Sequence, residues 1–175
     1  NVLKGIEVIA FPSGDGTTNG PLWSSVSHST GNFRILSLPP AGWQLRAEDT
    51  SNIWAPQWYD RKPSQDGSTV LTVGPADVNS LAITMLSRSI INATGTAGNG
   101  SATFEVLTTR KAGGSRPGGT VTVRRLGVTK TVNLVGGRAT VKLTGIPAGK
   151  RTFTVTYSGN STTAGTSKTV VVTVK

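Results

Sequence analysis

The stretch that most constrains the fold is 136–160, GGRATVKLTGIPAGKRTFTVTYSGN, in which two runs of alternating apolar and polar residues flank Ile146-Pro147-Ala148-Gly149. Alternation with a period of two is typical of a strand that has one face in a core and the other in water. Proline presets φ and glycine permits positive φ, so the residues between the runs favour a tight corner. The stretch therefore predicts two strands of a β-sandwich joined by a corner.

The same order of features occurs earlier in the chain. Residues 33–35 run into LPPAG at 38–42, and residues 43–46 continue the alternation. Strand-forming Val and Thr are abundant, and 22 Gly and 9 Pro separate the apolar runs, as in all-β sandwiches and barrels. We therefore expect an all-β chain of two tandem antiparallel β-sandwich modules, residues 1–86 and residues 87–175.

The remaining strands are predicted from the same alternation and from the turn residues between the runs. In the first module we expect strands at 5–11, 22–26, 33–35, 43–46, 69–73 and 81–86. In the second module we expect strands at 102–107, 120–124 and 169–175, besides the two in 136–160. Residues 87–101, which include Ile90-Ile91, are interpreted as a linker together with a first strand.

Charge is distributed unevenly over the two modules. Residues 1–86 hold five Lys or Arg and seven Asp or Glu, a formal charge of −2, whereas residues 87–175 hold thirteen Lys or Arg and one acid, a formal charge of +12; together they give the +10 of the chain. This asymmetry predicts two surfaces with different electrostatic partners. The absence of cysteine excludes disulfides and thiolate metal sites. No apolar run reaches the roughly 20 residues of a transmembrane segment.

The first module carries a recognisable pattern. It consists of Gly5-Ile6-x-Val8, then Thr30-Gly31-Asn32-Phe33-x-Ile35, then Leu38-Pro39-x-x-Gly42-Trp43-x-Leu45. This pattern resembles the carboxypeptidase regulatory-like (prealbumin-like) domains over about residues 1–86. The resemblance implies a β-sandwich of the kind found on secreted and surface proteins.

The resemblance also implies a further opening strand with a Gly-x-Val pattern, which is here absent or shortened to residues 1–3. A sandwich without that strand has an open edge, which is a template for another chain. We expect the edge to be filled by residues 1–3 folding back, by a strand of a neighbouring copy, or by the segment around Ile90-Ile91. Because the first module has a negative net charge and the second a positive one, electrostatic attraction favours contact between the first module of one copy and the second module of another.

The second module is similar to bacterial immunoglobulin-like repeat domains. The matching stretches are Gly118–Val123, Gly137–Val141, Leu143–Gly149 and Val155–Asn160. Such domains serve as spacers, adhesins and enzyme appendages, so the resemblance implies a fold and leaves the function open.

No group of residues predicts catalysis, a cofactor or a metal. The one histidine, His28, lies between two serines that would point to the opposite face of a strand, whereas a nucleophile needs its base within reach. Glu48 and Asp49 are adjacent and diverge on a strand, and Asp15, Asp60, Asp66 and Asp77 lie in turn sequences. Some relatives form a Lys–Asn or Lys–Asp crosslink beside a Glu. Lys4, Glu48 and Asp77 or Asn79 are the corresponding residues. Glu48 lies five positions after Trp43, so on a strand its side chain points to the face opposite that of Trp43. We therefore expect no crosslink.

Clustered aromatic residues are one candidate binding feature. Trp54, Trp58 and Tyr59 lie in a long irregular stretch, and exposed aromatic side chains can stack on sugar rings. The alternative is that they cover one end of the sandwich. Trp23 and Trp43 occupy strand positions and are predicted to lie in the core.

Basic residues of the second module are the other candidate. Arg124, Arg138 and Lys142 alternate with core residues and should project outward, and further charges lie in loops and corners. The full set is Arg110, Lys111, Arg124, Arg125, Arg138, Lys142, Lys150 and Arg151. Such a surface favours acidic polymers such as teichoic acid or acidic polysaccharide, or it serves only solubility. Without a recognition helix, sequence-specific nucleic-acid binding is not expected.

Together these features predict a non-enzymatic extracellular module of a bacterial surface or secreted protein. Its role would be structural or adhesive, with an acidic polymer of the cell wall or neighbouring copies of the same protein as partner. Two alternatives stay open: a carbohydrate-binding accessory module of a secreted hydrolase, and a phage virion surface or tail protein.

Overall fold

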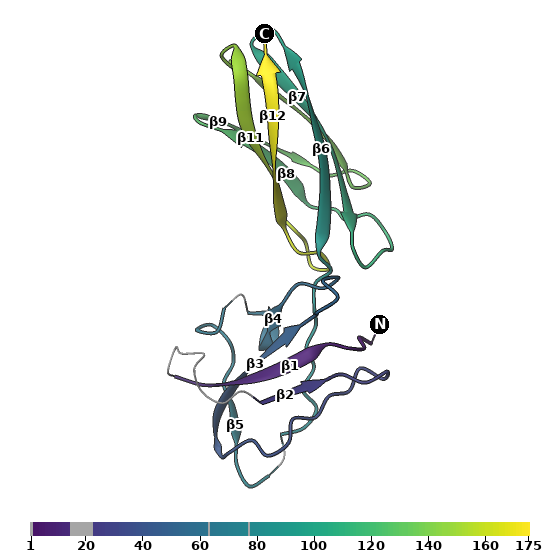
Figure 1. The fold of residues 1–175 in the computed structure, drawn as a ribbon, viewed down its shortest axis with the longest axis vertical. Helices are drawn as coiled ribbons and strands as arrows, with labels where there is room; N and C mark the ends of the chain where they lie inside the picture. The colour runs from purple at the N-terminus through teal and green to yellow at the C-terminus, as the bar shows by residue number, and fades with distance from the viewer. Residues whose placement is uncertain (1, 15–22, 63, 77) are drawn as a thin grey trace. The chain divides into compact units, whose positions relative to one another are not determined.

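The computed structural model describes residues 2–14, 23–62, 64–76 and 78–175 (Figure 1). The chain is all-β, and its ladders form three antiparallel sheets, which confirms the predicted fold class. Contacts divide it into two compact units, Asn1–Leu86 and Ser87–Lys175, which we call the N-terminal unit and the C-terminal unit. In the described part of the chain, no helix is long and apolar enough to cross a membrane.

The N-terminal unit contains a five-stranded sheet with the order β2-β1-β3-β4, in which β5 also pairs with β3. Its elements are β1 (Glu7–Pro12), β2 (Trp23–Val26), β3 (Ala41–Glu48), β4 (Gln57–Trp58), the short 3-10 helix η1 (Tyr59–Arg61) and β5 (Leu71–Val73). Strand β1 pairs with β2 on one side and with β3 on the other. Val8 and Ala10 of β1 are buried on one face, as the alternation predicts.

One face of this sheet carries the core of the unit. Val8, Ala10, Trp43 and Leu45 form its buried centre. The rings of Trp23 and Trp43 meet edge to face with centroids 4.9 Å apart, a geometry that aromatic pairs prefer. The prediction that both tryptophans lie in the core is confirmed for Trp43, which is buried, whereas Trp23 is partly buried and packs against the core.

Two of the strands predicted for this unit are wrong. Residues 33–35 and 81–86 are extended and alternate in burial, as strands do, but they belong to no ladder. Their inward side chains, Phe33 and Ile83 among them, pack against the core of the sheet. Alternation with a period of two predicts which side chains are buried, but it does not predict whether the backbone pairs with another strand.

Two of the expected ways of filling the open edge do not occur in the described residues, and the third, a strand of a neighbouring copy, stays a prediction. Ile90 and Ile91 lie in β6 (Ser89–Gly98) of the C-terminal unit, where the strand pairs with β7. Residues 2–3 join no ladder. The carbonyl of Leu3 accepts a 2.8 Å hydrogen bond from the Ser27 hydroxyl instead. Residue 1 lies outside the described residues.

The C-terminal unit has two sheets that pack face to face, one with the order β10-β7-β6 and the other with the order β12-β11-β8-β9. Besides β6, its strands are β7 (Ser101–Arg110), β8 (Thr120–Arg125), β9 (Val128–Asn133), β10 (Arg138–Thr144), β11 (Gly149–Tyr157) and β12 (Thr166–Val174). Strand β10 belongs to one sheet and β11 to the other. The predicted corner around Pro147 therefore carries the chain across the core.

The core of this unit lies between the two sheets. Phe104 of β7 and Phe153 of β11 are fully buried, and their ring centroids are 4.8 Å apart. Buried residues from both sheets surround them, including Val106, Val121, Val123, Val141 and Val155. The inward positions predicted for 136–160 are thus confirmed as core positions.

Tyr157 closes one end of this core. Its side chain is 1% exposed, and its hydroxyl donates a 2.8 Å hydrogen bond to the carbonyl of Gly118. Burial raises the pKa of the Tyr157 phenol, and a hydrogen bond with Thr163 and the charge of Arg110 offset this only in part. The neutral phenol therefore stabilises the fold below about pH 10, and this contribution is lost as the pH rises toward the higher pKa of the folded state.

We expect Tyr157→Phe to lower the free energy of unfolding of the C-terminal unit by about 1 kcal/mol at neutral pH, because the carbonyl of Gly118 loses the phenol as a donor and keeps the Asn160 amide at 3.3 Å. Above about pH 10 the stability of the variant should fall less steeply than that of the parent. Urea unfolding followed by circular dichroism at both pH values measures this. The same change at Tyr59, in the other unit, is the control. A steeper alkaline loss in the Tyr157 variant contradicts the prediction.

Candidate functional site

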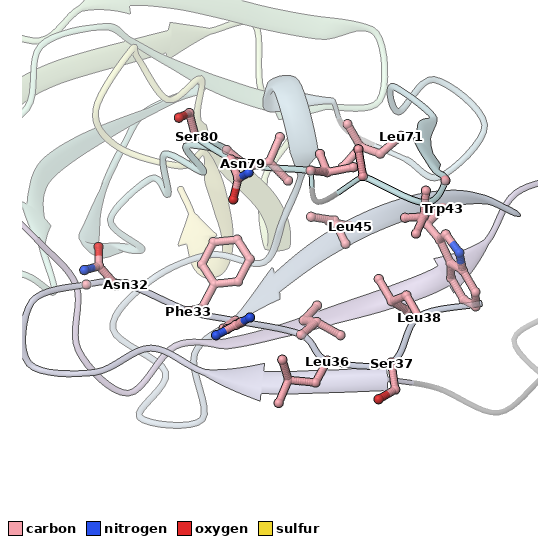
Figure 2. A pocket seen from close by; sticks show the side chains of 18 residues that line it. Asn32, Phe33, Leu36, Ser37, Leu38, Trp43, Leu45, Leu71, Asn79 and Ser80 are labelled. Atoms are coloured by element: carbon pink, nitrogen blue, oxygen red, sulfur yellow. The ribbon is translucent and has the colours of Figure 1, made fainter. Parts of the chain in front are cut away.

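A groove of about 810 Å³ lies over the core face of the N-terminal sheet. Its floor is formed by side chains of two paired strands: Trp43 and Leu45 of β3, and Leu71 and Val73 of β5. We call the segments on its two sides wall A (residues 31–38) and wall B (residues 74–76 and 78–81). Figure 2 shows Trp43, Leu45 and Leu38 within this groove, with Asn79 and Ser80 on the opposite wall.

Each wall contains one residue other than glycine in the left-handed backbone region. Ser37 of wall A has a φ of 60° and Ser80 of wall B has a φ of 61°. This conformation costs a residue other than glycine about 1–2 kcal/mol. Both serines line the groove (Figure 2). The sequence alone does not reveal the groove, because the apolar alternation beside it is also that of strands in a closed layer.

The structure separates the three aromatic residues that were predicted as a cluster. Trp54 packs beside the smaller hydrophobic cluster of the unit, whereas Tyr59 packs against the main core. Trp58 lies on the other face of the sheet, 5.1 Å from the ring of Phe11 and with the guanidinium of Arg46 5.8 Å from its ring centroid. The three rings therefore do not form one stacking platform.

The loop before Trp54 is held by the carboxylate of Asp49. One oxygen accepts hydrogen bonds from the backbone N–H and the hydroxyl of Ser51, and the other accepts from the N–H groups of Ile53 and Trp54, both at 2.8 Å. Burial tends to raise the pKa of Asp49, but the four hydrogen bonds outweigh it and hold that pKa below its ordinary value of 3.8. The carboxylate therefore stabilises this loop above that pH, and the contribution is lost as the pH falls through the lower pKa of the folded state.

We expect Asp49→Asn to lower the free energy of unfolding of the N-terminal unit by about 1–2 kcal/mol at neutral pH, because backbone N–H groups lose a charged acceptor. At about pH 2.5, below the ordinary pKa of 3.8, the difference from the parent should shrink, because the carboxyl group of the unfolded chain is then protonated and the stabilisation by the charge declines. Denaturation followed by tryptophan fluorescence tests both statements. Asp66→Asn changes an exposed acid of the same unit and is the control. An equal loss at both pH values contradicts the role of the charge.

The basic residues of the C-terminal unit do not gather on one surface. Arg138 and Lys142 of β10 project from the outer face of the three-stranded sheet, whereas Arg124 of β8 and Lys150 of β11 project from the outer face of the four-stranded sheet. These faces point in opposite directions because the sheets pack face to face. The guanidinium of Arg151 is bonded within its own corner, to the carbonyls of Pro147 and Ala148.

The other three predicted residues lie at strand ends. Arg110 ends β7, is half-buried and lies near Tyr157. The N–H of Lys111 donates to the carbonyl of Arg88 at 2.9 Å. Arg125 ends β8 and pairs with Val128 across a two-residue turn. Arg110 and Lys111 therefore lie at the end of β7, and Arg125 lies at the end of β8.

Both outer faces carry two cations and several hydroxyl side chains, and the difference between them that concerns charge is one acid. Glu105, the one acid of residues 87–175, lies on the three-stranded face, where both carboxylate oxygens accept the Thr140 hydroxyl at 3.0 Å. The four-stranded face carries Arg124, Lys150 and rows of hydroxyl side chains. In register across the strands are Thr169, Thr154, Arg124 and Thr129, and beside them Ser167, Thr156, Thr122 and Thr131. We call this surface the hydroxyl face.

The other residues considered for chemistry do not come together. His28 is exposed in a turn closed by its own backbone, and the Ser27 hydroxyl is bonded to Leu3 and Ile6. Glu48 forms an ion pair with Arg46 at 3.0 Å. Within the described ranges no three His, Cys, Asp or Glu side chains are placed to hold a metal ion. Residues 15 and 77 lie outside those ranges.

Comparison with known proteins adds little to this geometry. No protein-family model and no curated protein matches the sequence. Among solved structures, the chain is similar to a DUF3823 family protein from Bacteroides uniformis ATCC 8492, with 12% identity, a TM-score of 0.41, and coverage of 98% of this chain and 90% of that one.

Proposed function

We propose that this chain is a non-enzymatic structural and adhesive module of an extracellular bacterial protein, and that it binds an acidic polymer through the hydroxyl face. The observation that carries the proposal is the composition of that face. Two cations stand among hydroxyl side chains, and no acidic residue occurs on its described strands. Cations attract the polymer, and hydroxyl groups can donate hydrogen bonds to its phosphate or sugar oxygens.

The extracellular location is supported by the resemblance of the two units to domains of surface and secreted proteins. The net charge of residues 87–175, +12 against −2 for residues 1–86, favours an acidic partner for the C-terminal unit. No specific observation favours the accessory module of a hydrolase or the virion protein.

Two matched double variants test the proposal. Arg124→Ala with Lys150→Ala removes two charges from the hydroxyl face, and Arg138→Ala with Lys142→Ala removes two charges from the opposite face. Binding to purified teichoic acid in about 0.15 M salt should weaken by about tenfold in the first and by less than about threefold in the second. Equal losses would show attraction by net charge alone, and absence of binding by the parent would overturn the proposal.

A further inference from the structure

We propose that the hydroxyl face binds an extended glycerol phosphate chain that runs along β11, with one repeat of the polymer for every two residues of the strand. This inference rests on the proposed function, because it names the polymer that the same face would bind. Three features carry it: the spacing of the two cations, the hydroxyl groups between them, and the acid that interrupts the corresponding row on the opposite face.

The two cations of the hydroxyl face are set four residues apart along the strand direction. Lys150 belongs to β11, and Arg124 of β8 lies opposite Thr154 of β11 in the ladder. Four residues of a strand span about 13 Å and neighbouring strands are about 5 Å apart, so the two positions are about 14 Å apart. Strand side chains stand roughly perpendicular to the sheet, so the two charges project side by side. A ligand that contacts both therefore needs anionic groups at about this separation.

Two hydroxyl side chains lie between these charges. Lys150, Thr152 and Thr154 occupy alternate positions of β11, so they project from one face at intervals of about 7 Å. All three side chains are exposed. Val171 of β12 pairs with Thr152 in the ladder and is 49% exposed. The surface between the cations thus offers two hydroxyl donors and one apolar contact.

The neighbouring hydroxyl groups are already bonded within the protein. They form two pairs, Thr122 with Thr131 at 2.8 Å and Thr156 with Ser167 at 2.9 Å. By contrast, no hydrogen bond within the described part of the chain engages the hydroxyls of Thr152 and Thr154. These two groups can donate to a ligand without breaking a bond inside the protein.

A glycerol phosphate chain has the period of this row. Its repeat contains six backbone bonds, as do two residues of a polypeptide, so each extends by about 7 Å. With one phosphate at Lys150, the next lies at Thr152 and the third lies at Thr154, beside Arg124. The cations attract the two outer phosphates, and the Thr152 hydroxyl donates to the middle one. A ribitol phosphate repeat contains eight backbone bonds, so its phosphates do not keep this register.

The opposite face has the same cation spacing, but an acid lies between the charges. Arg138 and Lys142 are four residues apart on β10, with Thr140 midway. The Thr140 hydroxyl donates to both carboxylate oxygens of Glu105 at 3.0 Å. The middle position therefore carries a negative charge where the row on β11 has a hydroxyl that can donate. Because like charges repel, we expect that face to exclude the middle phosphate.

Defined glycerol phosphate oligomers test the spacing. Isothermal titration calorimetry with the full chain in about 0.05 M salt compares compounds with two, three and five phosphates. The compound with three should bind about tenfold more tightly than the compound with two, since only the longer one reaches both cations. The compound with five should gain about threefold more, because it can bind in three registers. A ribitol phosphate oligomer with three phosphates should bind about tenfold more weakly than its glycerol counterpart.

Matched double variants test the hydroxyl groups. Thr152→Val with Thr154→Val keeps the shape of the face but removes two free donors, and it should weaken binding of the three-phosphate compound about tenfold. Thr122→Val with Thr131→Val removes two hydroxyls that bond each other, and it should change binding by less than about threefold. Circular dichroism shows whether both variants are folded.

Failure of this inference is distinguishable from failure of the proposed function. If the long polymer binds through Arg124 and Lys150 but affinity rises gradually with oligomer length, the function stands and the inference is overturned. Equal binding of the glycerol and ribitol compounds, or equal losses in the two threonine variants, would overturn it as well. If the parent chain binds neither the oligomers nor the polymer, both proposals are overturned.

Discussion

Replacing Phe153 by alanine should destabilise the C-terminal unit by about 3–5 kcal/mol, the range found when a buried aromatic ring is truncated in a core. The ring is 0% exposed and lies 4.8 Å from the ring of Phe104. The surrounding side chains project from strands of two sheets whose positions are fixed by their ladders. The cavity can therefore collapse only in part, which places the loss in the upper part of the range.

The tryptophans make this prediction specific to one unit. All four tryptophans lie in residues 23–58, so their fluorescence follows the N-terminal unit alone. Amide hydrogen exchange in β11 and β12 follows the C-terminal unit. We expect Phe153→Ala to speed exchange in β11 and β12 and to leave the fluorescence transition in guanidinium chloride unchanged.

A control on the same strand separates core packing from strand propensity. Thr154 is exposed next to Phe153, and Thr154→Ala should cost less than about 1 kcal/mol. A parallel shift of the tryptophan transition in Phe153→Ala would show that the two units unfold together. We also expect residues 87–175 to fold alone, because this module has its own set of strands, and a dispersed amide spectrum of that fragment would support this.

Burial along single strands could be predicted from the sequence. The alternation in 136–160 identifies Val141, Phe153 and Val155 as inward-facing residues, and each of them is fully buried. This succeeds because a strand has a period of two, so a few residues of alternation determine which side chains face the core.

Pairing and sheet membership could not be predicted. The pattern of Phe33–Ile35 is that of a paired strand, yet the segment is unpaired. Strands β10 and β11 look like a hairpin in sequence but lie in different sheets. Strand pairing and sheet membership depend on contacts between residues that are distant in sequence, and the local alternation of apolar and polar residues carries no information on such contacts.

The candidate sites show the same division. Strand parity predicts that Arg124, Arg138 and Lys142 project outward, and it does not predict that they belong to opposite faces. The hydroxyl face exists only through the registers of β8, β9, β11 and β12. The groove forms where wall A and wall B, about 40 residues apart in sequence, border one floor.

Gly159→Ala is expected to be nearly as damaging as the loss of Phe153, although it adds only one methyl group. Gly159 has a φ of +77°, and a Cβ at this position would lie 2.7 Å from the nitrogen of Gly165 and 2.9 Å from the carbonyl oxygen of Thr163. Both contacts are to backbone, so no side chain can rotate away. The left-handed conformation costs about 1–2 kcal/mol, and forcing atoms into a closely packed site costs about 1–3 kcal/mol more.

Gly145 provides the matched control for this prediction. It has a φ of +69°, but a Cβ there would meet nothing within 4 Å. Gly145→Ala should therefore show the conformational cost alone, about 1–2 kcal/mol, against about 2–5 kcal/mol for Gly159→Ala. Amide exchange of β11 and β12 under increasing denaturant measures both variants in the full chain. If the two losses are equal, the close approach of the backbone around Gly159 does not contribute, and the turn tolerates a side chain there.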